Sequence, residues 1–185
     1  MSVEIEAKLK VDSAEPVKNK LAELGAEFLA EQLQTDYYFD DPEASLTKTD
    51  RCLRLRQELA GDSKKALLTY KGPREKGNFK KREEAEVEVA DVDSAKRFIL
   101  AIGYKGTVVF EKKRLIWRLG ECMVSLDELP LLGYFVEIEG PDDEKIADVQ
   151  RNLGLSDLPH IQESYAYLME RKLNQLGAAK REVFL

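Results

Sequence analysis

The sequence is poor in the residues that build disulfides and zinc sites. Its 185 residues include two cysteines and one histidine. Cys52 and Cys122 lie far apart, with no CxxC or Cys/His grouping around them. This spacing favours two reduced thiols over a disulfide or a bound zinc ion. His160 stands alone before the last predicted helix, so a structural or solvent-facing role is favoured over catalysis.

Long apolar runs are also missing. No segment approaches the roughly 20 apolar residues that a membrane helix requires. The N-terminal MSVEIEAK reaches charged residues too early to form the apolar part of a secretory signal. A Walker-type, glycine-rich phosphate loop is absent from the sequence as well. We therefore expect a cytoplasmic protein that binds no membrane.

The charge balance limits the partners of the chain. A net charge of −6 is opposite to the basic excess that nucleic-acid surfaces show, so we expect no nucleic-acid partner. A composition of 43% hydrophobic and 35% charged residues is typical of one soluble globular domain. We predict a single domain over residues 1–175 and a loosely attached C-terminal tail over 176–185.

Carboxylates spaced two residues apart are what the sequence has in abundance. They occur in VEIEAKLK, EAEVEV and FVEIEG, as Glu4 and Glu6, Glu86 and Glu88, and Glu137 and Glu139. In a strand, residues i and i+2 share one face while the apolar residues between them share the other. One face is therefore a row of carboxylates, which makes sense only if it meets water or a charged ligand.

Helices are predicted where apolar residues recur at three or four positions: 13–24, 93–102, 142–153 and 161–173. Polar residues able to cap the first three of them precede or open each segment. These candidates are Asp12 or Ser13, then Asp91, Asp93 or Ser94, and then Asp142.

Strands outnumber helices. Eight runs of alternating polarity cover residues 3–11, 34–40, 51–58, 65–71, 82–90, 107–118, 121–127 and 134–139. Because loops or single helices join neighbouring runs, antiparallel pairing follows. About eight strands that close on themselves leave room for side chains and one small ligand. The predicted fold is α+β: an eight-stranded antiparallel β-barrel with helices packed on its apolar outer face.

The polar face of these strands is a candidate site. Carrying the alternation through every strand places the following side chains on it: Glu4, Glu6, Lys8, Lys10, Arg54, Arg56, Thr69, Lys71, Arg82, Glu84, Glu86, Glu88, Lys112, Arg114, Ser125, Asp127, Glu137 and Glu139. Isolated buried ions cost several kcal/mol each, so these charges must be paired or bound to a ligand. Carboxylates hold Mg²⁺ or Mn²⁺ together with substrate phosphates, and Arg and Lys bind phosphate oxygens. The chemical match is a triphosphate. Other basic residues are expected on loops and strand ends: Lys64, Lys65, Lys80 and Lys81.

Five ordered motifs in residues 2 to about 170 resemble the CYTH family of triphosphate tunnel metalloenzymes. They are ExExK at Glu4 to Lys8, RLR at Arg54 to Arg56, TYKGP around Lys71, EKxR at Glu111 to Arg114, and LDELPLLGYFVEIE up to Glu139. The resemblance implies a barrel that forms a tunnel, a small-molecule triphosphate substrate, and activity that depends on Mg²⁺ or Mn²⁺.

By motif position, the resemblance also implies roles for the tunnel side chains. The metal-binding acids would be Glu4, Glu6, Asp127, Glu137 and Glu139. The phosphate ligands would be Lys8, Lys10, Arg54, Arg56, Lys71, Arg82, Lys112 and Arg114. Our candidate for the general base that activates water is Glu84 or Glu86.

Three functions remain open from the sequence. The first is a triphosphatase acting on inorganic triphosphate, thiamine triphosphate or a nucleotide. The second is a class IV adenylyl cyclase; that group carries an HF pair about eight residues ahead of ExExK, and this pair is missing here. The third is a non-catalytic polyphosphate or nucleotide binder, and either a monomer or a homodimer is compatible with each. Family triphosphatases often place a basic residue before a Ser-Tyr pair of the last helix, whereas Gln162 and Glu163 precede Ser164 and Tyr165 here.

Overall fold

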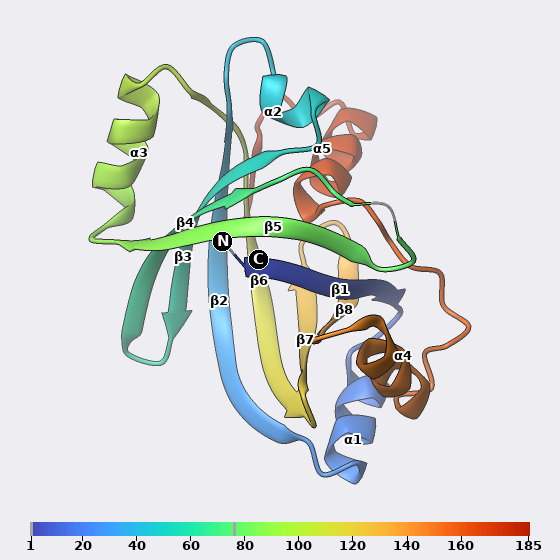
Figure 1. Cartoon of the computed structure of the whole chain (residues 1–185). Coiled ribbons are helices and arrows are strands. Elements are labelled where there is room, and N and C mark those ends of the chain that lie inside the picture. The colour runs from blue at the N-terminus through green and yellow to red at the C-terminus, as the bar shows by residue number, and fades with distance from the viewer. Residues whose placement is uncertain (1, 76) are drawn as a thin grey trace.

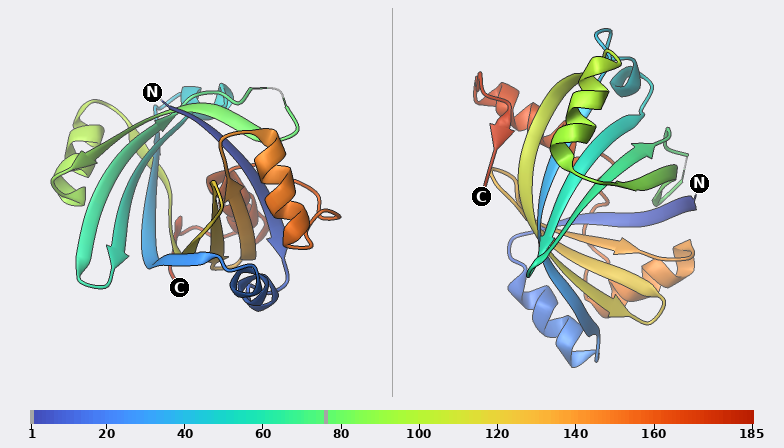
Figure 2. Two further views of the ribbon diagram at one scale, coloured as in Figure 1. Left: turned by 60° about the horizontal axis from the view of Figure 1, so that its bottom comes forward. Right: turned by 90° about the vertical axis from the view of Figure 1, so that its left-hand side faces the viewer.

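A computed structural model describes residues 2–75 and 77–185, so Met1 and Lys76 of the predicted domain lie outside the described residues. Within this part of the chain, eight antiparallel strands close into a barrel (Figures 1 and 2). They are β1 (Ser2–Val11), β2 (Glu27–Asp40), β3 (Cys52–Ala60), β4 (Ser63–Lys71), β5 (Lys80–Val89), β6 (Lys105–Leu119), β7 (Cys122–Leu129) and β8 (Gly133–Glu139). Their order is β2-β3-β4-β5-β1-β8-β7-β6, and pairing of β2 with β6 closes the barrel. The predicted fold class is confirmed.

The largest difference between the predicted and the observed strands is in β2. The sequence predicted a strand only over 34–40, whereas β2 begins at Glu27. Its first half pairs with β6, where Glu27 lies opposite Arg118 and Glu31 opposite Leu115. Strand pairing across a long sequence separation, and not local alternation, determines this part of the chain.

The helices follow the predicted segments closely: α1 (Glu15–Glu23), α3 (Val92–Ala101), α4 (Asp143–Asn152) and α5 (Tyr165–Gln175), with a short α2 (Ser45–Lys48) between β2 and β3. Asp91 and Asp142 cap α3 and α4 as predicted, because their carboxylates accept the amide hydrogens of Ser94 and Lys145. The N-cap of the first helix is Ala14, one residue after the predicted Ser13. The Ser13 hydroxyl nevertheless accepts the amide hydrogen of Glu15 at 3.3 Å.

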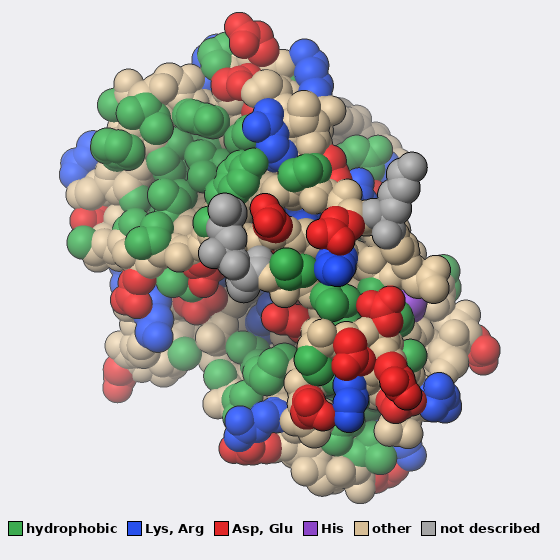
Figure 3. All heavy atoms as spheres, in the orientation of Figure 1, with side chains coloured by type: hydrophobic (Ala, Val, Ile, Leu, Met, Phe, Trp, Pro, Cys, Tyr) green, Lys and Arg blue, Asp and Glu red, His purple; other side chains and the backbone are tan. Residues whose placement is uncertain are grey.

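Apolar outer faces of the strands carry most of the helices. Leu21 of α1 and Ile146 of α4 are fully buried in one cluster with Ile138 of β8. On the other side of the barrel, α3 buries Ile99 against Leu55 of β3 (Figure 2). Apolar side chains remain exposed over α3 and the adjoining sheet, where Figure 3 shows them gathered. The outer faces therefore supply packing, and the charged residues of the strands must lie elsewhere.

Helix α5 closes one end of the barrel interior. Its Met169 and Leu173 pack with Tyr38, Phe110 and Phe135, all within one buried cluster. Phe110 shares its strand face with Lys112, so this apolar layer and the charged layer occupy successive depths of the same interior. The predicted fourth helix began at 161, whereas α5 starts at Tyr165 with Ser164 as its N-cap.

The last residues are attached to the barrel. Glu182–Val183 forms β9, which pairs in parallel with β6. The backbone N–H of Val109 donates to the carbonyl of Arg181 at 2.8 Å. The predicted tail over 176–185 thus begins one residue after α5, but it is held by backbone hydrogen bonds and not loosely attached. Among residues 2–75 and 77–185, Cys52 and Cys122 are free thiols, as predicted, and no helix is long and apolar enough to cross a membrane.

Candidate functional site

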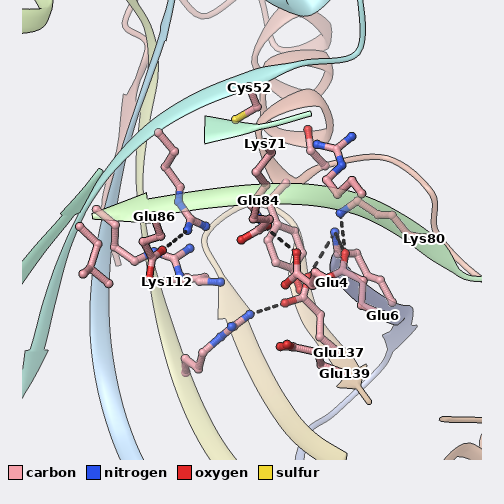
Figure 4. A pocket seen from close by; sticks show the side chains of 18 of the residues that line it. Glu4, Glu6, Cys52, Lys71, Lys80, Glu84, Glu86, Lys112, Glu137 and Glu139 are labelled. Atoms are coloured by element: carbon pink, nitrogen blue, oxygen red, sulfur yellow. Dashed lines mark hydrogen bonds and ion pairs between the residues drawn. The ribbon is translucent and has the colours of Figure 1, made fainter. Parts of the chain in front are cut away.

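The barrel encloses a cavity of about 300 Å³ whose walls are mostly charged (Figure 4). In the described part of the chain, the acidic side chains that line it are Glu4, Glu6, Glu58, Glu84, Glu86, Glu137 and Glu139. The basic ones are Lys8, Arg54, Arg56, Lys71, Lys80, Arg82, Lys112 and Arg114. The ionic faces of the strands therefore converge on one interior, as the alternation predicted. We call this cavity the tunnel.

Strand register explains which charges meet. Residues directly opposite on an antiparallel pair have neighbouring side chains on the same face. Glu6 of β1 lies opposite Lys80 of β5 on one side and Glu139 of β8 on the other. Lys8 lies opposite Glu137, and their side chains pair at 3.2 Å. Register on adjacent strands thus accounts for the pairs of Glu6 with Lys80 and of Lys8 with Glu137.

Four carboxylates, those of Glu4, Glu6, Glu137 and Glu139, lie where β1 and β8 pair (Figure 4). Glu4 pairs with Lys71 at 3.0 Å, and Glu6 pairs with Lys80. Glu139 makes no ion pair among residues that the structure describes. Burial, and next the negative charges of Glu4 and Glu6, raise the pKa of Glu139 to about 7. This corner of the tunnel therefore carries more negative charge than its own cations neutralise.

These acids fit a hard divalent cation. No three His, Cys, Asp or Glu side chains of the described residues converge into a complete cage for a metal ion. Mg²⁺ is usually held by one or two carboxylates together with waters and substrate phosphates. Glu139, which has no ion pair among the described residues, and the neighbouring Glu4 and Glu6 match that incomplete ligand set. The chemistry of the donors is thus compatible with Mg²⁺ or Mn²⁺.

The cations across the tunnel are held in fixed positions. Arg56 donates from Nε and an NH₂ group to the two carboxylate oxygens of Asp36, at 2.6 and 2.8 Å. Arg54 donates to Thr69 at 3.1 Å, and Thr69 donates in turn to Glu86 at 2.8 Å. Burial, and next the positive charge of Arg114, lower the pKa of Lys112 to about 7. So dense a group of cations would be stabilised by an anion.

The structure does not place Lys10 in the tunnel. Its side chain is exposed, and its amine lies 5.6 Å from the centre of the Phe135 ring. Lys8, on the same strand face, has only 2% of its surface exposed. Lys10 lies one step further along the barrel, beside the apolar layer that α5 covers. A phosphate-binding role for Lys10 has no support from this geometry.

Asp127 also lies outside the tunnel lining. It is 1% exposed, and both its oxygens accept hydrogen bonds from Arg114. Tyr165 donates to one of these oxygens at 2.9 Å, and Lys112 lies 3.4 Å from it. A carboxylate occupied in this way orients the cations above it, and a metal-binding role does not fit its surroundings.

The predicted bases Glu84 and Glu86 both line the tunnel. Glu84 pairs with Lys71 across the register of β4 and β5. Glu86 accepts from Thr69, and its side chain remains 42% exposed. Glu88, two residues further on, is exposed and does not appear in the lining.

Sequence reasoning missed several contributors, among them Glu58 of β3, which lines the tunnel. Lys80 was expected at a strand end in solvent, but it is 6% exposed and contacts Glu6 inside the tunnel. Asp36 is fully buried beneath Arg56. Tyr165 reaches the tunnel wall from α5. Alternation along 34–38 could have identified Asp36, because it shares a face with Gln34 and Tyr38.

The start of α5 reaches the tunnel without a basic side chain. Ser164 and Tyr165 line it, and the amine of Lys8 donates to the carbonyl of Glu163 at 3.1 Å. Arg171 and Lys172 do not appear in the lining. Within the described residues, the cations of the tunnel therefore come from the strands alone.

The closed barrel forms a tunnel in which carboxylates and cations face each other, and such a charge distribution is complementary to a polyanion. The chain belongs to the CYTH domain family, whose family model matches residues 2–165. Adenylate cyclase CyaB of Aeromonas hydrophila is 31% identical over 180 residues, which are 92% of this chain and 90% of that protein.

Solved structures give the same fold. PH1819 protein from Pyrococcus horikoshii OT3 superposes with a TM-score of 0.80 at 28% identity, covering 91% of this chain and 99% of that chain. HpAC1 from Hippeastrum, described as having a dominant triphosphatase activity, superposes with a TM-score of 0.67 at 19% identity, covering 96% of this chain and 97% of that chain. At 19% identity, the similarity to HpAC1 shows a shared fold.

Proposed function

We propose that this protein is a divalent-metal-dependent triphosphatase that hydrolyses inorganic triphosphate or an organic triphosphate, such as thiamine triphosphate or a nucleotide. The observation that supports it is the division of the tunnel wall. The carboxylates of Glu4, Glu6 and Glu139 lie on β1 and β8, and the guanidinium groups of Arg54, Arg56 and Arg114 lie on β3 and β6. Such a wall is complementary to a metal ion on one side and to phosphate oxygens on the other.

The cations of the tunnel bind and orient the phosphates. Arg54, Arg56 and Arg114 present planar guanidinium groups that bind phosphate oxygens through paired hydrogen bonds. Asp36 and Asp127 hold two of these groups in place before substrate arrives. Charge that grows on the phosphoryl oxygens then meets donors that need no reorganisation.

The carboxylates have two roles in this proposal. Glu4, Glu6 and Glu139 would hold Mg²⁺ or Mn²⁺, which, when bound, neutralises phosphate charge and favours ionisation of bound water. Glu86 is our preferred general base, because its exposed oxygen can accept a proton from water while Thr69 fixes its position. Glu84 is the alternative, although Lys71 already engages it.

Adenylyl cyclase activity is the second candidate. It is favoured by the 31% identity with Adenylate cyclase CyaB over 92% of the chain. The same tunnel could present the α-phosphorus of ATP to the ribose 3′-hydroxyl and release pyrophosphate. The two reactions differ in which phosphorus meets which nucleophile.

Product analysis separates these functions. The purified protein is incubated with tripolyphosphate, thiamine triphosphate or ATP in Mg²⁺ or Mn²⁺. Release of inorganic phosphate supports hydrolysis, and cyclic AMP with pyrophosphate from ATP supports the cyclase. Tight, metal-assisted binding without any product would indicate that the protein is a non-catalytic binder of polyphosphate or a nucleotide.

A matched pair of variants tests the metal site. Glu6→Gln should abolish turnover while the circular dichroism spectrum is retained, because the amide keeps the shape but loses the charge. Glu88 belongs to a pair of glutamates spaced like Glu4 and Glu6, but it is exposed and lies outside the tunnel lining. Glu88→Gln should therefore leave turnover unchanged. Full activity in Glu6→Gln would remove Glu6 from the metal site.

A further inference from the structure

Tyr165, the first residue of α5, presents its ring to two lysines of the tunnel. The amine of Lys8 lies 4.2 Å from the centre of the ring, and the amine of Lys112 lies 5.0 Å from it. The face of an aromatic ring carries partial negative charge, and an ammonium group within about 6 Å of the ring centre is attracted to it. One ring therefore contacts two cations of the candidate site.

The spacing of buried residues along α5 explains why this ring faces the barrel interior. Tyr165, Met169 and Leu173 follow one another at intervals of four residues, so they share one face of the helix. All three are buried in one cluster over the interior. Met169 and Leu173 belong to the apolar layer, whereas Tyr165 also lines the tunnel. The N-terminal end of this helix face thus meets the charged layer.

Contacts with two further strands hold the ring in place. The Tyr165 hydroxyl donates to Asp127 of β7 at 2.9 Å, and the ring packs edge to face on Phe135 of β8, with 5.2 Å between the ring centres. Lys8 and Lys112 belong to β1 and β6, which β8 and β7 separate in the barrel. Strand register sets neighbours on adjacent strands, so it does not fix these two amines relative to each other. The ring that both amines contact does.

Lys112 has few other partners. It is 1% exposed, and its only hydrogen-bond partner in the described part of the chain is Asp127, at 3.4 Å. An ammonium group has three N–H donors, and a buried charge whose donors are not satisfied is costly. Lys8, by contrast, pairs with Glu137 at 3.2 Å and donates to the carbonyl of Glu163 at 3.1 Å. The ring face therefore supplies negative charge where Lys112 needs it.

We propose that Tyr165 is a positioning residue: its ring face holds the ammonium groups of Lys8 and Lys112 at fixed places in the tunnel, where they bind phosphate oxygens. Tyr165 acts through the two lysines, and not by a contact of its own with the phosphates. This inference rests on the proposed function and extends it. It gives α5 a part in phosphate binding, although Arg171 and Lys172 of that helix lie outside the tunnel lining.

Removing the ring is the direct test. Tyr165→Leu keeps an apolar side chain on α5, and the control, Leu173→Ala, removes packing about two turns away on the same buried face. Steady-state rates are measured with tripolyphosphate, thiamine triphosphate and ATP in Mg²⁺. For the triphosphate with the highest kcat/KM, Tyr165→Leu should raise KM about tenfold and change kcat less than about threefold. Leu173→Ala should lower Tm and leave KM unchanged. Unchanged KM in folded Tyr165→Leu, or an equal rise in Leu173→Ala, would overturn the proposal.

A pair of nearly isosteric rings covers the case in which Tyr165→Leu does not fold. Tyr165→Phe keeps the ring and loses the hydroxyl, and 3,4,5-trifluorophenylalanine at the same position carries fluorine atoms that withdraw electrons from the ring face. Tyr165→Phe should keep KM within about threefold of the wild type, and the fluorinated ring should raise KM about fivefold further. Equal KM values for the two rings would contradict a role of the ring face.

Nuclear magnetic resonance of the free protein separates a failure of this proposal from a failure of the proposed function. Protons that lie over an aromatic ring are shifted upfield, so the ε-methylene signals of Lys8 and Lys112 should be displaced in the wild type. Lys8→Met and Lys112→Met assign these signals. If neither lysine signal is displaced, the proposal is wrong. If both are displaced and the wild type turns over no triphosphate, the proposed function fails, while the placement of the two amines by Tyr165 is supported.

Discussion

Replacing Glu139 by glutamine tests whether the acidic corner of the tunnel is built for a cation. Glu139 lies opposite Glu6 on the neighbouring strand, and Glu4 is two residues away from Glu6 on the same face. Burial, and next these two negative charges, raise its pKa from 4.5 to about 7. In metal-free buffer, the folded protein therefore keeps a proton on Glu139 that the unfolded chain loses near pH 4.5.

The sign of the effect follows from proton linkage. Between pH 4.5 and about 7 the folded state binds more protons than the unfolded state, so its stability falls as pH rises through this window. The full difference in pKa corresponds to about 3 kcal/mol at 1.36 kcal/mol for each pH unit. Because part of the Glu139 side chain remains exposed to solvent, screening reduces our expected value to about 1 kcal/mol.

Urea and thermal unfolding in chelator provide the assay. At pH 8 Glu139→Gln should be more stable than the wild type by about 1 kcal/mol, or about 2–4 °C in Tm for a chain of this length. At pH 4 the two proteins should unfold alike. Excess Mg²⁺ should reverse the order, because the wild type keeps the carboxylate that binds the ion.

Glu88→Gln, at an exposed position, is the control and should show no such pH dependence. A Glu139→Gln variant that is less stable than the wild type at pH 8 in chelator would refute the reasoning. So would a stability difference that persists unchanged at pH 4.

Two further predictions concern the cations. Asp36→Ala leaves the buried guanidinium of Arg56 without its carboxylate and should lower the free energy of unfolding in urea by about 3–5 kcal/mol. The control, Arg118→Ala, removes an exposed ion pair and should lower it by under about 1 kcal/mol. Equal losses in the two variants would contradict the burial argument. Lys80→Met should raise the KM of the preferred triphosphate about tenfold, roughly 1.4 kcal/mol of binding, while Lys81→Met, at the surface, should not change it. The placement of Lys80 in the site would be wrong if both lysine variants behaved alike.

Depth inside the barrel separates what alternation could predict from what it could not. Lys8 and Lys10 occupy one strand face by alternation, yet one is buried in the tunnel and the other is exposed. Alternation fixes the side of the sheet, but strand tilt and register across the sheet fix the level along the barrel axis. The same limit applies to Asp127, which alternation placed correctly on the inner face but not beneath Arg114.

Local signals determined much of the remaining architecture. The alternating strands, the caps Asp91 and Asp142, and the free thiols Cys52 and Cys122 depend on neighbours in sequence or on simple composition, and they were predicted. The ordered ionic motifs were enough to indicate the family and the fold. These features are local, so no tertiary contact was needed to infer them.

Only the tertiary structure decided how the charges are used. Pairing of strands far apart in sequence places Glu139 beside Glu6, where it makes no ion pair with any residue that the structure describes, and brings buried Lys80 to Glu6 from β5. The closed barrel also receives α5 over its interior, where the ring of Tyr165 contacts Lys8 and Lys112. An ion's role depends on the charges and solvent around it, and those surroundings come from segments that only the closed barrel brings together.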